Sequence, residues 1–162
     1  MTATEPPDPD RPASGEELLR RGLLGLATLG TIGTTLELVL LRHWHGRLEL
    51  IAFAALGTLA VAILLVVRRP SARSIRAGRA LAAAVLVTSV IGVLVHVWSN
   101  YESAPLDFRY TASWPTTPEP IRWLLAATDT VGDSPTLAPA ALAFLALALL
   151  IATVRHPATR LP

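Results

Sequence analysis

The residues of this sequence that could do chemistry are two glutamates and three histidines that lie in or beside long apolar stretches. Carboxylate oxygens and imidazole nitrogens together suit a divalent transition metal such as Zn, Mn, non-haem Fe or Cu(II). Their spacing matches no standard metal-ligand motif, so the chemistry is not fixed by the pattern alone. The candidate metal ligands are Glu37, His43, His45, Glu49 and His96.

Four apolar stretches supply the elements that must position these side chains. The chain has 162 residues, of which 52% are hydrophobic. Each stretch is close to the roughly 20 residues with which a helix crosses about 30 Å of hydrocarbon. The sequence therefore predicts an all-α fold, a four-helix transmembrane bundle within residues 15–157. The predicted spans cover approximately residues 22–41, 48–67, 80–99 and 136–154.

Three of the candidate ligands arrive at nearly the same depth when these spans are threaded through a bilayer. Glu37 lies about one and a half turns inside the end of the first span, at a rise of 1.5 Å per residue. Glu49 begins the second span, and His96 lies less than a turn from the end of the third. A charge at mid-bilayer costs about 2.5 to 3.5 kcal/mol, so such groups normally face a partner or a cavity. We expect a shared Glu/His pocket near the extracytoplasmic face.

Three alternatives to a metal site stay open. In the first, Glu37 pairs with His96, Arg42 or Arg47 and only stabilises the bundle. In the second, His96 is an axial ligand of a porphyrin, and Gly92, one turn earlier, lets the flat ring approach. In the third, Glu37 is the proton-carrying carboxylate of a small transporter.

The distribution of arginine predicts how the chain is oriented. Residues 68–79 carry five Arg and no acidic residue, and short Arg-rich loops stay on the cytoplasmic side. We therefore expect a multi-pass protein of the cell membrane with both termini in the cytoplasm. Residues 1–14 are Pro-rich and acidic, which predicts a disordered cytoplasmic tail. Because the arginines cluster at helix ends, the high pI indicates the lipid bilayer and not nucleic acid as a partner.

Residues 100–134 form the one long connection, which lies on the extracytoplasmic side in this topology. Pro120 is followed by apolar residues at helical spacing from Ile121 to Thr128. This stripe predicts a short amphipathic helix that lies on the outer membrane surface or caps the bundle. Three loop carboxylates either extend the polar pocket or serve as solvated side chains and helix caps. They are Asp107, Asp129 and Asp133.

Composition narrows the function without identifying it. The chain has no Cys and no Lys, which excludes disulfides, thiolate chemistry and Schiff bases. It also lacks hydrolase and nucleotide-binding motifs, so whether it is an enzyme stays open. Small residues at Gly30, Gly33 and Ala84 could pack against a second copy or a larger membrane complex. Two classes remain: a membrane protein whose Glu/His pocket binds a metal, and an accessory or scaffolding subunit with no chemistry of its own.

Overall fold

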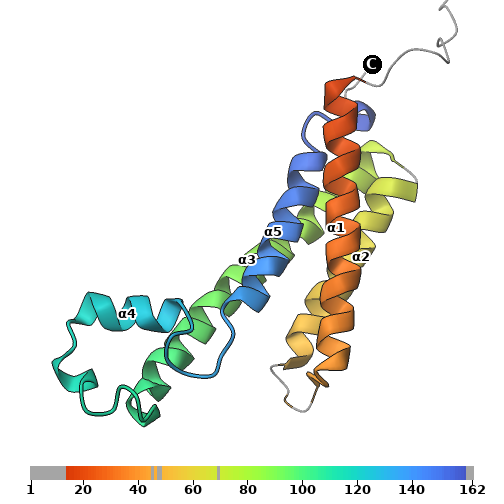
Figure 1. Ribbon diagram of the computed structural model, residues 1–162. Coiled ribbons are helices and arrows are strands. Elements are labelled where there is room, and N and C mark those ends of the chain that lie inside the picture. The colour runs from red at the N-terminus through yellow and green to blue at the C-terminus, as the bar shows by residue number, and fades with distance from the viewer. Residues whose placement is uncertain (1–13, 45, 47–48, 69, 160–162) are drawn as a thin grey trace, which may run out of the picture.

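The structure, a computed structural model, describes residues 14–44, 46, 49–68 and 70–159. Nearly all of the predicted N-terminal tail lies outside these residues. The described part contains five α-helices and no strand, which confirms the predicted all-helical class (Figure 1). The helices are α1 (Gly15–Leu40), α2 (Glu49–Arg68), α3 (Ala72–Ser103), α4 (Glu119–Ala127) and α5 (Leu137–Ala152).

Three of these helices, α1, α2 and α3, are long and apolar enough to cross a membrane. The fourth predicted span is realised as α5, which has only 16 residues. At 1.5 Å per residue α5 is about 24 Å long, which is shorter than the roughly 30 Å of hydrocarbon. With 32 residues, α3 is longer than one crossing needs. The structure thus supports a membrane-embedded helical protein with three candidate spans.

Glycines mark the places where the helices approach one another most closely. A Cβ on Gly30 of α1 would overlap the side chain of Leu145 on α5. A Cβ on Gly78 of α3 would lie 2.9 Å from Val66 Cγ2 on α2. The absence of a side chain at these positions therefore lets α1 pack against α5, and α3 against α2, at short range.

The two ends of the molecule differ in how tightly the helices pack. We call the end with Arg20, Arg68 and Arg155 the Arg-rich end, and the end with the α1–α2 connection the hairpin end. Figure 1 shows α3 and α5 leaving α1 and α2 toward the hairpin end, while α4 lies against the far part of α3. The described structure is therefore a bundle at the Arg-rich end that opens toward the hairpin end.

Candidate functional site

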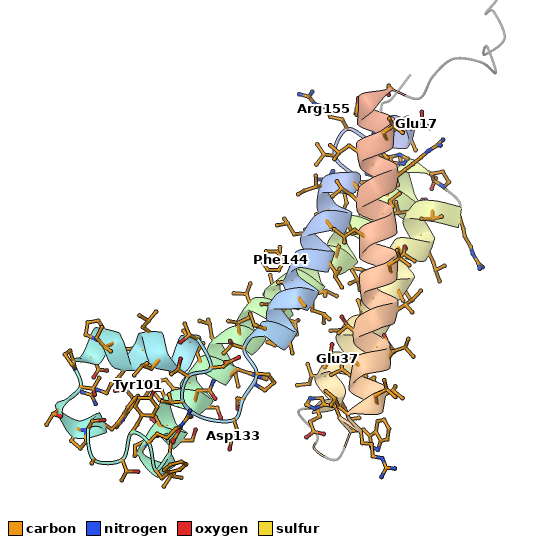
Figure 2. All side chains as sticks on the ribbon, in the orientation of Figure 1. Glu17, Glu37, Tyr101, Asp133, Phe144 and Arg155 are labelled. Atoms are coloured by element: carbon orange, nitrogen blue, oxygen red, sulfur yellow. The ribbon has the colours of Figure 1, made fainter. Side chains whose placement is uncertain are left out.

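Glu37 lies near the hairpin end of α1, on the same side of the helix as Gly30, two turns away. Its side chain is exposed, and within the described residues no cation or hydrogen-bond donor contacts it. Gly33, one turn earlier, is also open, since a Cβ there would meet nothing within 4 Å. In Figure 2, Glu37 lies on the part of α1 from which α5 has diverged. The side of α1 that α5 covers at Gly30 is therefore uncovered at Glu37.

His43 takes part in the turn that ends α1. The N–H of His43 donates to the Leu38 carbonyl over 2.9 Å, and the N–H of Arg42 donates to the Val39 carbonyl over 3.0 Å. Arg42 has φ +52°. Together these features form a Schellman motif, in which the residue after the helix adopts the left-handed conformation. The contribution of His43 seen here is made by its backbone.

Glu49 stabilises the start of α2. Its Oε2 accepts a hydrogen bond from the Gly46 N–H over 3.1 Å, and its own N–H donates to the Gly46 carbonyl over 3.2 Å. This reciprocal pair satisfies backbone N–H groups that have no hydrogen-bond partner within the helix at its start. Glu49 therefore has a local structural role, whatever else it binds. His45 and Arg47 lie outside the described residues.

His96 lies on α3 at the level where α5 begins. Its Nδ1 is buried and has no hydrogen-bond partner in the part of the chain that the structure describes. Gly92, one turn earlier, faces α5, because a Cβ there would lie 3.1 Å from Pro139 Cβ. Pro139 therefore occupies the space beside Gly92 that a porphyrin would require.

The described residues place Glu37 and His96 on different helices. Glu37 is on α1, which packs against α2 and α5, whereas His96 is on α3, which packs against α2, α4 and α5. Within the described residues, no group of three or more His, Asp or Glu side chains is arranged to hold a metal ion. The five-residue metal site includes His45, which is not described, so it stays a prediction.

A polar cluster that sequence reasoning missed is centred on Asn100. This residue is fully buried at the end of α3, and its side chain contacts three segments. Its Nδ2 donates to the carbonyls of Ala126 (3.1 Å) and Ser134 (2.8 Å) and to Asp129 Oδ1 (3.2 Å). Its Oδ1 accepts from the Ser134 N–H over 2.8 Å. One amide thus joins the end of α3 to the end of α4 and to the segment before α5.

Asp129 and Gly132 complete this cluster. Asp129 accepts hydrogen bonds from the Thr136 N–H on both carboxylate oxygens, each over 3.1 Å. Gly132 has φ +78°, and a Cβ there would overlap the Asn100 side chain. Only glycine fits such a conformation and such a contact at low cost. Asp129 therefore acts as a structural carboxylate of the loop, one of the two roles that the sequence left open.

A second cluster joins α4 to the end of α3 through aromatic rings and one carboxylate. Tyr101 stacks on Trp123 with ring centroids 4.2 Å apart. Glu119 Oε1 accepts hydrogen bonds from the Tyr101 hydroxyl (2.8 Å) and from Trp123 Nε1 (3.0 Å). Arg122 pairs with Glu119 Oε2 over 2.8 Å and lies over the Trp114 ring. The ring stacking and the hydrogen bonds of Glu119 together hold α4 against the end of α3.

Asp107 and Arg109 form an ion pair in the loop between α3 and α4. Arg109 donates to both carboxylate oxygens of Asp107, at 2.6 Å to Oδ2 and 3.0 Å to Oδ1. The hydrogen bond from Arg109 holds the pKa of Asp107 below its ordinary value. Arg109 also donates to the Thr130 carbonyl over 3.1 Å. Asp107 is therefore used within the loop and does not extend toward Glu37.

The described contacts distinguish the two carboxylates among the predicted ligands. Among the predicted ligands, Glu37 is the carboxylate that the described structure leaves exposed and unpaired, whereas Glu49 is engaged in the hairpin. Comparison of the chain with protein-family models, with curated proteins and with solved structures gives no significant match.

Proposed function

We propose that this protein is an accessory subunit of a larger membrane complex, and that a transmembrane helix of another protein packs against α1 at Gly33 and Glu37. The observation that carries the proposal is the position of Glu37. It is exposed on an apolar helix long enough to span a membrane, and no described residue pairs with it.

The energetics of the bilayer favour a partner at this position. Glu37 precedes the end of α1 by three residues, or about 4.5 Å. The free-energy cost of an acidic side chain at this depth is lower than at mid-bilayer. The side chain is still more stable beside a polar partner than in contact with hydrocarbon alone. A basic side chain from a neighbouring helix would satisfy it, and the open Gly33 one turn away would allow close approach. The proposed partner is thus a helix that carries Arg or Lys at the depth of Glu37.

Orientation in the membrane is part of the same proposal. Arg68, Arg73, Arg76 and Arg79 gather around the connection of α2 and α3, and Arg155 follows α5. Short basic connections are retained in the cytoplasm. We infer that the Arg-rich end is cytoplasmic and that the hairpin end faces outward. Helix α5 would then cross with help from the polar residues that flank it.

Photo-crosslinking in native membranes tests the proposal. A photoreactive amino acid replaces Leu40, which follows Glu37 by three residues on the same side of α1. The matched control replaces Leu64, an exposed leucine of α2. We expect an adduct at Leu40 with a different protein, whose linked segment contains Arg or Lys, and a several-fold lower yield when Glu37→Gln removes the charge.

Three outcomes contradict the proposal. Equal adducts at Leu40 and Leu64 would mean that the crosslinker reports general crowding. An adduct between two copies of this chain would make the partner a second copy. A yield unaffected by Glu37→Gln would remove the charge pairing on which the partner's identity rests.

The competing function is the metal-binding pocket. Neither the described contacts nor the uncovered position of Glu37 favours it over a protein partner. Its test is independent of crosslinking, because a bound metal is measured on the purified protein alone.

A further inference from the structure

Helix α4 packs one side against the end of α3 and leaves apolar residues exposed on the other side. Glu119 and Arg122 face the aromatic cluster of Tyr101, Trp114 and Trp123. Ile121 and Leu124 lie on the opposite side and are 45% and 57% exposed. In a helix on the surface of a water-soluble domain the apolar stripe faces the core. Helix α4 does bury Ala126 and pack Leu125 against the protein, but Ile121 and Leu124 leave a second apolar surface uncovered.

The charged residues of α4 have partners within the protein. Both oxygens of Glu119 are in use: Oε1 accepts from Tyr101 and Trp123, and Oε2 pairs with Arg122. The side chain of Arg122 is 25% exposed and that of Glu119 is 54% exposed, so the pair lies at the edge of the packed surface. These contacts fix which side of α4 faces the end of α3.

The outward apolar side of α4 continues onto α3. Trp98 of α3 is 58% exposed, and its ring centroid lies 5.8 Å from that of Trp123. Leu94 of α3, one turn before Trp98, is exposed as well. Since α3 is long and apolar enough to cross a membrane, this exposed side of α3 is the side that lipid would contact. The apolar surface of α4 is an extension of it.

We propose that α4 lies within the interface of the membrane leaflet at the hairpin end, with Ile121 and Leu124 among the lipid acyl chains. Figure 1 shows α4 running across the direction of α1, beside the half of the molecule that contains the hairpin end. A helix parallel to the membrane plane at this level would have its apolar side about 5 to 10 Å below the headgroups. Trp98, Tyr101 and Trp123 would then belong to the aromatic belt that marks a membrane interface.

This placement assigns α4 a structural role. Anchored at the interface, it holds the far part of α3 at a fixed depth, and tilt is set by such anchors and by helix packing. It would thereby keep α3 and α5 apart from α1 at the hairpin end. The inference does not depend on the proposed partner at Glu37, because it concerns only contacts between α4 and lipid.

Spin labelling tests the proposal directly, because the chain contains no Cys and each introduced cysteine is the only one. The full chain is reconstituted in vesicles of phosphatidylcholine and phosphatidylglycerol. Labels are placed singly at Leu124→Cys and Ile121→Cys. Ala112→Cys, in the exposed loop, is the solvent control, and Leu64→Cys, in α2, is the lipid control. Collisions with oxygen report lipid, and collisions with a water-soluble nickel chelate report solvent.

We expect both α4 positions to show an oxygen-to-nickel collision ratio several-fold above that of Ala112→Cys and closer to that of Leu64→Cys. A ratio equal to that of Ala112→Cys at both positions would place α4 in water and overturn the proposal. Exclusion of both reagents would mean that protein covers the helix, which also overturns it. Both residues are exposed, so their replacement should leave the packing of α4 on α3 intact. Two labelled positions are used so that a local effect of one label does not decide the result.

Discussion

Asn100 and Ser134 are joined by a reciprocal pair of hydrogen bonds, although 34 positions separate them in the chain. Asn100 Nδ2 donates to the Ser134 carbonyl, and the Ser134 N–H donates to Asn100 Oδ1, both over 2.8 Å. The pair brings the entry to α5 against the end of α3. It closes the long connection and determines where α5 begins its return along the bundle.

Replacement of Asn100 should therefore destabilise the protein strongly. In Asn100→Ala the buried carbonyls of Ala126 and Ser134 and the Ser134 N–H lose their partner. We expect a loss of about 2 to 4 kcal/mol in the free energy of unfolding, because unpaired buried polar groups cost more than the hydrogen bonds they replace. Asn100→Asp should also destabilise, since it removes both donors and adds a charge beside Asp129. Thermal unfolding in detergent measures the change.

Ser99→Ala is the matched control for Asn100. Ser99 is the neighbouring residue on α3, and its hydroxyl contacts the Ser134 hydroxyl over 3.1 Å at the surface. We expect a change within about 0.5 kcal/mol, as for most exposed substitutions. If Asn100→Ala were as mild as Ser99→Ala, the buried amide would not be what holds α5 in place.

The sequence was sufficient to predict the helices, because apolar length and the capping and turn residues around them are local properties. Three of the predicted spans correspond to α1, α2 and α3. The fourth predicted span, 136–154, corresponds to α5 (Leu137–Ala152), but the sequence did not predict which contacts hold the segment before it. That backbone is held by Asp129 and Asn100, and side chains so distant in sequence leave no periodic signal.

The Glu/His pocket was predicted from depth in the bilayer. Glu37 and His96 can lie at similar depth in a bilayer, but depth does not decide which helices are neighbours. Helix packing decides which helices are neighbours, and it places α5 between α1 and α3 at Gly30 and Gly92. Asn100 was missed because a single amide at the end of an apolar helix resembles an ordinary interfacial residue. Its only signal was its polarity at the boundary of the predicted span.

Gly30 and Gly33 should respond differently to leucine. Gly30 faces Leu145 of α5 with no room for a side chain, whereas Gly33 faces open space. We expect Gly30→Leu to cost about 1 to 3 kcal/mol through overpacking. Gly33→Leu should leave the thermal stability of the purified chain within about 0.5 kcal/mol of the parent. Equal destabilisation by both variants would mean that α1 is rotated about its axis relative to this structure.

The inferred orientation predicts the behaviour of reporter fusions. The arginines between Arg68 and Arg79 should retain their connection in the cytoplasm. A reporter that is active only in the cytoplasm should work when fused at Ser74 and fail at Ser113, and an extracytoplasmic reporter should give the reverse. The opposite pattern would invert the orientation and place the hairpin end in the cytoplasm.

Metal content decides the competing function. If Glu37 and His96 are ligands, protein purified in detergent should contain stoichiometric Zn, Mn, Fe or Cu by elemental analysis. Glu37→Gln and His96→Ala should each abolish that metal, and His156→Ala, at the Arg-rich end, should leave it unchanged. Metal that survives both substitutions would belong to another site, and the Glu/His pocket would have to be abandoned.

His156 should make the stability of the Arg-rich end depend on pH. Its pKa is lowered from the ordinary value, first by burial and then by the charge of Arg20. Its Nδ1 accepts a hydrogen bond from the Ala158 N–H over 3.2 Å, which requires that this nitrogen carry no proton. The unfolded chain therefore binds the proton more readily, so the stability contributed by neutral His156 is present above about pH 6.5 and lost as the pH falls below it. Thermal unfolding of the parent and of His156→Gln at about pH 8 and about pH 5 measures the difference. The parent should lose more stability than the variant between these values, because the two proteins differ only at position 156. An equal loss in the two proteins would show that protonation of His156 is not coupled to folding.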